Sequence, residues 1–324
     1  MIKVAVTETE YHKGRSVFET AEGVHCFAAP TDEEGLARAV RSAGARHAVV
    51  GTGRYADDLY RALPKGGVIA RFGVGHDNID KTRATEAGLL CTNTPGVLDD
   101  SVAEHTVALM LAAARHLPLL TTRTKAGDWV QPLGRELRGK TLAVIGCGRI
   151  GCRVAHIAAF GLGMRVIGCD VLEMNLPHVG FADVVRKFSR AVGQADFVTL
   201  HIPGTPQTHH FLDQQRLEQM PSNAWLINTA RGAVVDEVAL YDALCQRRIA
   251  GAALDVFGVE PYAPISPDKD LRTLDNVIMT PHVASSTQEA CDAMARRALE
   301  NILLAERGQY QEMDLLNEEV LSRF

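Results

Sequence analysis

The sequence lacks any run of apolar residues long enough to cross a membrane, which takes about 18 to 20 residues in a helix. Its start, MIKVAVTETE, has an apolar stretch far shorter than the core of a secretion signal. Neither sign of charge is clustered, and 34 Lys+Arg stand against 39 Asp+Glu. A nucleic-acid surface that releases counterions needs clustered cations. We therefore expect a cytoplasmic protein that binds neither membranes nor nucleic acid.

Cysteine pairs with the spacing of a zinc site or a disulfide framework are also missing. The seven cysteines are odd in number and scattered, at positions 26, 91, 147, 152, 169, 245 and 291. Several lie inside apolar, strand-like runs such as RVIGCD (165–170). This distribution favours buried, reduced thiols. No histidine or cysteine set has metal-ligand spacing, so we expect no metal.

What the chain does contain is a series of short apolar runs separated by helix-like stretches. Its 324 residues predict about two domains, and 46% hydrophobic with 23% charged residues is typical of a globular protein. Continuous apolar strands that alternate with helices indicate parallel sheets covered on both faces, an α/β fold. The expected strands are residues 2–6, 47–51, 67–72, 88–92, 141–146, 165–170, 196–201, 224–229, 250–256 and 276–280.

Two helix-start signals suggest where the chain passes between domains. Ser101 to Glu104 and Ser286 to Glu289 both have the spacing of a capping box. We expect the first helix to end near Pro118 and the second to run to about Glu306, before Gly308. These helices bracket a central domain, predicted at 99–288. Residues 1–98 and 289–324 would then form a second, split domain.

The segment from Gly146 through Gly148 to Gly151 has the G-x-G-x-x-G spacing, directly after the strand TLAVI and at the start of a helix. A side chain at the first glycine would block the tight turn. At the second it would exclude a pyrophosphate, and at the third it would separate helix from strand. The helix N-terminus then offers amides to phosphate.

An acidic residue strengthens this prediction. Asp170 ends the next strand, 170 − 151 = 19 residues past the last glycine. A carboxylate there accepts hydrogen bonds from ribose hydroxyls and repels a 2′-phosphate. The following Val171, Leu172 and Glu173 supply no cation for such a phosphate. We therefore predict NAD rather than NADP as the cofactor.

Three polar residues follow three successive expected strands: Arg231, Glu260 and His282. In parallel α/β sheets, ligands bind beyond the carboxyl ends of the strands, so the three should face one crevice. An arginine can hold a carboxylate and polarise a ketone. A histidine can donate a proton to that ketone, and a glutamate can fix the imidazole tautomer and stabilise its charged form. Taken singly, each of the three is also an ordinary loop residue.

Several longer segments carry a resemblance to a known family. They are RFGVGHDNID (71–80), NTPGVLDDSVAEHTVALML (93–111), LRGKTLAVIGCGRIG (137–151), HIPGTPQT (201–208), NTARGAVVDEVAL (228–240), AALDVFGVEP (252–261) and TPHVASST (280–287). These segments occur in the same order as in the D-isomer-specific 2-hydroxyacid dehydrogenases, the group that includes D-3-phosphoglycerate dehydrogenase. The chain therefore resembles that family. The resemblance implies two Rossmann-like parallel-sheet domains, with the NAD-binding domain inserted in a split substrate (lid) domain.

The resemblance also implies roles for individual residues. Arg231, Glu260 and His282 would be catalytic, and the amides of Val74 and Gly75 would hold the substrate carboxylate. Arg71 would bind a substrate phosphate or second acid group, unless it forms an ordinary ion pair. The implied cofactor contacts are Thr94, Thr106, Gly146, Gly148, Arg149, Ile150, Gly151, Asp170, Pro203, Thr208, Thr229 and Asp255.

The expected activity is the NAD-dependent interconversion of a 2-keto acid and a D-2-hydroxy acid, in a homodimer joined through the cofactor domain. The substrate would be like that of phosphoglycerate dehydrogenase or of a hydroxypyruvate/glyoxylate reductase. The alternative is an NAD(H)-sensing interaction protein like the C-terminal-binding corepressors, which carry a long disordered tail that we do not expect here. A third possibility, a formate dehydrogenase, ranks low because such an enzyme would have glutamine at the position of Glu260.

Overall fold

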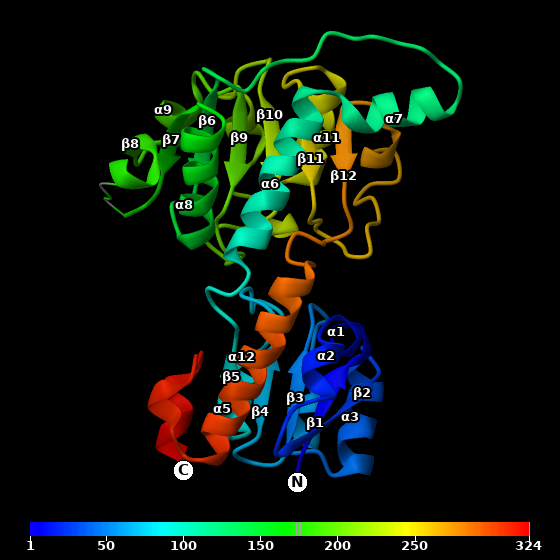
Figure 1. The fold of residues 1–324 in the computed structure, drawn as a ribbon, viewed down its shortest axis with the longest axis vertical. Helices are drawn as coiled ribbons and strands as arrows, with labels where there is room; N and C mark the ends of the chain where they lie inside the picture. The colour runs from blue at the N-terminus through cyan, green and yellow to red at the C-terminus, as the bar shows by residue number, and fades with distance from the viewer. Residues whose placement is uncertain (173, 175, 324) are drawn as a thin grey trace. The chain divides into compact units, whose positions relative to one another are not determined.

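The computed structural model describes residues 1–172, 174 and 176–323. By contacts the chain divides into two compact units, coloured along the chain in Figure 1. Unit 1 comprises Met1–Leu98 and Ser285–Phe324, and unit 2 comprises Asp99–Ala284. The second crossing therefore falls between residues 284 and 285, four residues before the position predicted from the sequence.

Unit 1 is built on a five-stranded parallel sheet in the order β2-β1-β3-β4-β5. Helices α3, α4 and α5 cover one face with the apolar cluster around Leu36, Leu59 and Ile69, while α1, α2 and α12 pack on the other face. The strands are β1 (Ile2–Thr7), β2 (Val24–Ala29), β3 (His47–Val50), β4 (Val68–Arg71) and β5 (Leu90–Thr92). The helices are α1 (Glu8–Lys13), α2 (Arg15–Phe18), α3 (Glu33–Ala43), α4 (Asp58–Ala62), α5 (Lys81–Glu86), α12 (Gln288–Glu306) and the 3₁₀ turns η5 (Tyr310–Glu312) and η6 (Glu318–Arg323).

Unit 2 is built on a seven-stranded parallel sheet in the order β12-β11-β10-β9-β6-β7-β8. Its strands are β6 (Thr141–Ile145), β7 (Arg165–Cys169), β8 (Phe181–Val185), β9 (Phe197–Leu200), β10 (Trp225–Asn228), β11 (Gly251–Leu254) and β12 (Val277–Met279). Its helices are α6 (Asp99–Ala114), α7 (Leu117–Lys125), α8 (Arg149–His156), α9 (Phe188–Val192), α10 (Gln214–Leu217) and α11 (Glu237–Cys245), with the π-helical segment η1 (Ile157–Gly161) and the 3₁₀ turns η2 (Pro177–Val179), η3 (Gly232–Val234) and η4 (Leu271–Thr273).

Two apolar cores lie on opposite faces of this sheet. Adjacent strand residues point to opposite faces, so Ala143 belongs to the core under α9, α10 and α11, whereas Val144 belongs to the core under α6 and α8. Both faces are therefore buried, as the continuous apolar strands indicated. The predicted α/β fold with parallel sheets is confirmed.

Two strands, β2 and β8, were not expected from the sequence. Each lies at the edge of its sheet, and each exposes part of its length, for example His25 in β2 and Asp183 in β8. A half-exposed edge strand carries polar residues among its apolar ones, so it does not form the continuous apolar run that marks a central strand.

Both predicted capping boxes are wrong in detail. Helix α6 begins at Asp99, and the hydroxyl of Ser101, inside the helix, donates to the carbonyl of Ala284 at 2.8 Å. In α12 the N-cap is Thr287, whose hydroxyl accepts from the amide of Ala290 at 3.2 Å. The neighbouring Ser286 instead accepts a hydrogen bond from the Lys13 side chain.

The first of the two predicted helices ends earlier than expected, and the second ends where expected. Helix α6 ends at Ala114, and Pro118 lies in the first turn of the next helix, α7, where its missing amide costs nothing. Helix α12 does end at Glu306, and Gly308 follows with a φ of 70°.

Among the described residues no helix is both long and apolar enough to cross a membrane, including α12 with its 19 residues. All seven cysteines lie in the described part of the chain and are free thiols. Five of them are buried, which agrees with the expectation of inert core cysteines.

The cap of α12 provides a test of the helix assignment. Replacing Thr287 with Ala should lower the free energy of unfolding by about 1 kcal/mol, because an amide in the first turn loses its acceptor. Ser286→Ala is the matched control and should cost clearly less, since Ser286 does not cap the helix. Urea denaturation of both variants measures the difference, and a larger loss for Ser286→Ala would contradict the observed cap.

Candidate active site

The glycine-rich loop joins β6 to α8 in unit 2. Gly146 has a φ of 95°, and a Cβ there would strike the carbonyl oxygen of His201. A Cβ at Gly151 would strike the carbonyl oxygen of Gly146. A Cβ at Gly148, in contrast, would meet no atom within 4 Å. Gly146 and Gly151 are thus required by the packing of the protein itself. Gly148 instead borders open space at the N-cap of α8, where a pyrophosphate would approach.

Asp170 lies beside this loop, directly after β7. Its carboxylate accepts hydrogen bonds from the amides of Cys147 at 2.8 Å and Leu172 at 2.9 Å. These two bonds fix the carboxylate next to the glycine-rich loop, the position from which such an acid contacts a ribose. Val171 and Leu172 are exposed, and Glu173 lies outside the described residues.

Other predicted cofactor residues of unit 2 occur in contacting pairs. Thr106 on α6 and Thr229 after β10 are both buried and share a hydrogen bond of 2.8 Å. Thr208 donates to the carbonyl of Pro203 at 2.5 Å, which closes the turn after β9. The first pair joins α6 to the segment after β10, and the second lies within the loop after β9.

Arg149 and Ile150 are the first two residues of α8, so their amides have no acceptor within the helix. The guanidinium of Arg149 is exposed and pairs with Asp99 at 2.7 Å, and Ile150 packs on the apolar core under α6 and α8. What these two residues offer a phosphate is therefore their backbone.

Glu260 and His282 contact each other directly. The Nδ1 atom of His282 lies 2.7 Å from Oε2 of Glu260, and each side chain is about 30% exposed. The other carboxylate oxygen accepts from the amide of Phe257 at 3.0 Å. The glutamate is thus fixed by its own loop while it holds one ring nitrogen, which leaves Nε2 of the histidine to face a ligand.

His282 has a backbone φ of 53°, in the left-handed region, and Asp255 stabilises the segment around it. The Asp255 carboxylate is fully buried and accepts from the hydroxyl of Thr280 and from the amides of Val283 and Ala284. Burial alone would raise the pKa of Asp255, but these hydrogen bonds and one from His105 outweigh it, so the pKa lies below its usual value.

Arg231 lies between β10 and the turn η3, and its guanidinium donates to the carbonyl of Ala230 at 2.6 Å. The next residue, Gly232, packs directly on the Phe257 backbone, because a Cβ there would overlap the Phe257 carbonyl group. The structure therefore brings together the segments that carry Arg231, Glu260 and His282, all after strands β10 to β12.

The remaining predicted residues lie in unit 1: Arg71 is the last residue of β4, and the others follow β4 or β5. Among the described residues, the amides of Val74 and Gly75 donate no hydrogen bond, while the Val74 carbonyl accepts from Asn93 at 2.8 Å. Thr94 is buried, and its hydroxyl has no described partner. Arg71 is only 6% exposed and donates to the carbonyl of Phe72, which precedes the Val74–Gly75 loop.

Sequence reasoning missed Glu237, the first residue of α11. Its carboxylate is buried and accepts from the amide of Gly258 at 2.6 Å, next to the segment that carries Glu260. Acidic residues are common in the first turn of a helix, where they usually face solvent. The sequence therefore contained no signal that this one is buried.

A glycine-rich strand-to-helix turn with an acid beside it, and an imidazole held by a carboxylate at the same sheet, are typical of the class of dinucleotide-dependent dehydrogenases. Residues 107–284 match the family model described as "D-isomer specific 2-hydroxyacid dehydrogenase, NAD binding domain". The chain belongs to the D-isomer specific 2-hydroxyacid dehydrogenase family.

Relatives over most of the chain agree. The chain is 40% identical to D-3-phosphoglycerate dehydrogenase of Methanocaldococcus jannaschii over 96% of its own length, but it spans only 59% of that protein. It is 38% identical to a glyoxylate reductase of Thermofilum pendens, over 90% of this chain and 86% of that one. D-lactate dehydrogenase of Aquifex aeolicus, solved with NAD and lactic acid, is 28% identical with a TM-score of 0.80, over 97% and 99% of the two chains.

These similarities confirm the predicted family, fold class and cofactor, NAD. The class of enzyme that the family model describes is the one predicted from the sequence, and the interaction-protein alternative is not favoured. The individual site residues remain predictions.

The glycine loop gives a test that separates binding from folding. Gly148→Ala should weaken NADH binding without changing the unfolding temperature, because its Cβ enters space that only the cofactor would fill. Gly151→Ala should destabilise unit 2 by about 1–3 kcal/mol, because its Cβ overlaps the backbone. Fluorescence titration and thermal unfolding measure the two effects. Equal destabilisation by both substitutions would contradict the assignment.

Asp170 provides a second test. Asp170→Ala should reduce the preference for NADH over NADPH, since the carboxylate that accepts from a ribose and repels a 2′-phosphate is removed. The ratio of the two dissociation constants measures the preference. An unchanged ratio would show that another residue reads the ribose.

Proposed function

We propose that this protein reduces a 2-keto acid to a D-2-hydroxy acid with NADH, and that Arg231, Glu260 and His282 are its catalytic residues. The observation that carries the proposal is the 2.7 Å contact between Glu260 and His282. An imidazole that is fixed at one nitrogen by a carboxylate, in a side chain that is partly exposed, is arranged to exchange a proton with a ligand.

His282 acts as the general acid in this mechanism. Its Nδ1–H donates to Glu260, and its protonated Nε2 gives a proton to the ketone oxygen. The carboxylate stabilises the imidazolium form before the transfer. NADH, when bound, supplies the hydride to the carbonyl carbon. In the oxidising direction the neutral imidazole takes the proton back from the hydroxyl.

The substrate carboxylate needs positive partners, and two sets are available. The amides of Val74 and Gly75 have no described acceptor of their own, and consecutive amides form an anion-binding concavity. The guanidinium of Arg231 offers a second, charged partner. We therefore propose Val74, Gly75 and Arg231 as substrate-binding residues, and Thr94 as a cofactor-binding residue in addition to those of unit 2.

Arg71 adds positive charge beneath the same loop. A Cβ at Gly73 would lie 2.9 Å from a guanidinium nitrogen of Arg71, so the two groups are in close contact. We propose that Arg71 supports substrate binding from this position. The candidate substrates are short 2-keto acids, with or without a phosphate: glyoxylate, hydroxypyruvate, pyruvate and phosphohydroxypyruvate.

A substrate panel tests this function. Oxidation of NADH should be observed with at least one of the four keto acids, and His282→Ala should lose roughly 100- to 10,000-fold in kcat, the usual contribution of a general acid, while NADH binding is retained. No turnover across the panel despite tight NADH binding would refute the enzyme proposal. A His282→Ala variant within a few-fold of the wild type would remove His282 from its role.

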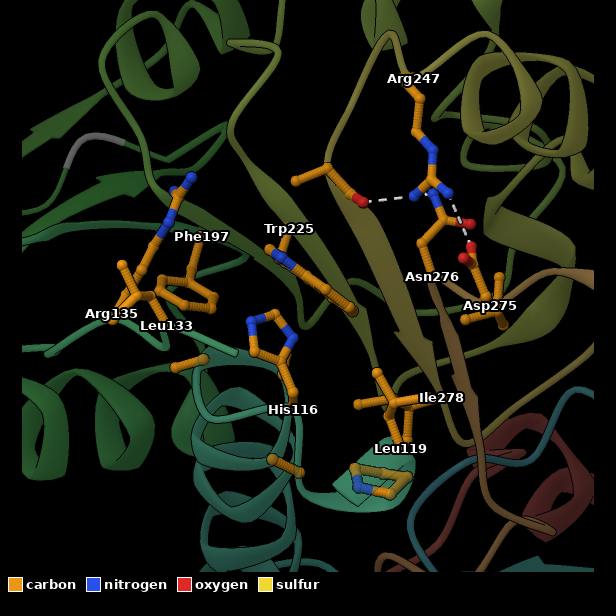
Figure 2. Close-up of a pocket in the computed structure, with 16 residues that line it drawn as sticks. His116, Leu119, Leu133, Arg135, Phe197, Trp225, Arg247, Asp275, Asn276 and Ile278 are labelled. Carbon is orange, nitrogen blue, oxygen red and sulfur yellow. Dashed lines mark hydrogen bonds and ion pairs between the residues drawn. The ribbon is translucent and has the colours of Figure 1, made fainter. Parts of the chain in front are cut away.

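We also propose that the protein is a homodimer joined through unit 2. Half of the twelve large hydrophobic side chains exposed in the described structure lie between residues 111 and 133, on α6, α7 and the segment after it, as Trp129 and Leu133 do. Beside them lies a pocket of about 400 Å³, lined by apolar and aromatic side chains such as Phe197 and Trp225 and by polar ones such as Arg247 and Asp275 (Figure 2). An apolar patch of this kind favours a protein interface, and a second copy presents the same surface.

Light scattering tests the dimer. The wild type should have twice the mass of one chain, and a Trp129→Ser/Leu133→Ser variant should shift toward the monomer, because it removes the two most exposed apolar side chains of the patch. Phe160→Ser is the matched control, since Phe160 is also exposed but lies outside the patch. A monomeric wild type would refute the proposal.

The cytoplasm is the location we propose for the protein. All seven cysteines are free thiols, and thiols persist in a reducing compartment.

A further inference from the structure

The buried carboxylate of Glu237 is not explained by the helix it begins. Helix α11 already has an N-cap, because Asp236 accepts from the amides of Val238 and Ala239. Glu237 is nevertheless only 6% exposed, and burying a carboxylate is costly unless it is hydrogen-bonded. Burial raises the pKa of Glu237, and the negative charge of Glu260 raises it further. The hydrogen bond from Gly258 lowers it, but the pKa remains above its usual value.

The partner of this carboxylate lies two residues before Glu260. The amide of Gly258 donates to Glu237 at 2.6 Å, and the amide of Phe257 donates to Glu260 at 3.0 Å. Two carboxylates therefore hold successive amides of one short segment. One of them, Glu260, is the group that contacts His282.

The other side of this segment packs on the turn that carries Arg231. A Cβ at Gly232 would overlap the Phe257 carbonyl and the Gly258 amide nitrogen. The Gly258 backbone thus lies between the turn after β10 and the Glu237 carboxylate. It has no space to move toward the turn. A shift of residues 257 and 258 would change the positions of Glu260 and of the Arg231 turn together.

We propose that Glu237 is a positioning residue for the reaction. By accepting a hydrogen bond from the Gly258 amide, it fixes the distance between Glu260 and His282. It also fixes the backbone surface on which the Arg231 turn packs. The inference rests on the catalytic roles proposed above. Glu237 touches neither proposed reacting group. It acts through the backbone of residues 257 and 258.

The consequence is specific to the chemical step. Without the bond, the segment gains freedom and Glu260 holds the imidazole less well, so His282 is oriented for proton transfer less of the time. The residues that we propose to contact NADH in the glycine-rich loop follow β6, a different strand, so the affinity for NADH should not change.

Three variants test the inference. Glu237→Ala should lower kcat about 10- to 100-fold, the effect of a misplaced catalytic group, with KM for NADH within about twofold of the wild type. Glu237→Gln, which keeps an acceptor oxygen, should retain kcat within about threefold. Glu237→Asp keeps the charge but not the reach and should be impaired like Ala, which preserves the test if Ala folds poorly.

Two controls separate positioning from general damage. Asp213→Ala removes a helix-capping carboxylate of α10 in the same unit and should leave kcat and KM unchanged. In a Glu260→Ala background, Glu237→Ala should add less than about a twofold loss, because residues that act through one another are not additive.

The outcomes are decisive in each direction. A Glu237→Ala protein with wild-type kcat would overturn the inference, and so would a Glu237→Gln protein impaired as strongly as Glu237→Ala. Either result, in a wild type that reduces a keto acid, leaves the proposed function intact. Amide exchange at Phe257 and Gly258 reports the bond without any turnover. Unchanged exchange in Glu237→Ala would also overturn the inference.

Discussion

The parallel direction of the seven strands in unit 2 is the constraint on which the candidate site depends. Because all seven strands run the same way, their carboxyl ends share one edge, and every loop that follows a strand begins there. The glycine-rich loop, Asp170, Arg231, Glu260 and His282 come from five different strands and are separated by up to 136 residues (282 − 146). No local interaction would bring them together.

Backbone contacts then set the distances at this edge more tightly than side chains do. Gly151 allows α8 to approach the β6 turn, and Gly232 allows the turn after β10 to lie on the Phe257 backbone. At both places a single methyl group would force the chain segments apart. Asp255 has a related role for β12, because its carboxylate binds the amides that follow His282.

The proposed chemistry follows from these fixed backbones. An imidazole is effective as a general acid only when its tautomer and direction are defined, and here a carboxylate defines both. That carboxylate is itself held by an amide of its own loop, and the loop is held from behind by Glu237. The geometry is therefore layered, with each group oriented by one that lies further from the imidazole of His282.

Where the sequence misled, the reason was local. The serines at 101 and 286 have capping-box spacing, but the chain enters each helix at a different residue because tertiary contacts recruit the hydroxyls: Ser101 binds Ala284 and Ser286 binds Lys13. The edge strands β2 and β8 were missed since half-exposed strands lack a continuous apolar run.

The amino-acid sequence alone determined the α/β class, ten of the twelve strands, the dinucleotide loop with its acid, and the family, because these depend on local patterns and on motif spacing. Only the tertiary structure decided that Glu260 contacts His282, that Asp255 holds the histidine segment, and that Glu237 is buried behind the Glu260 loop. Contacts between residues far apart in the chain depend on how the strand ends are juxtaposed, and no pattern within one segment records that.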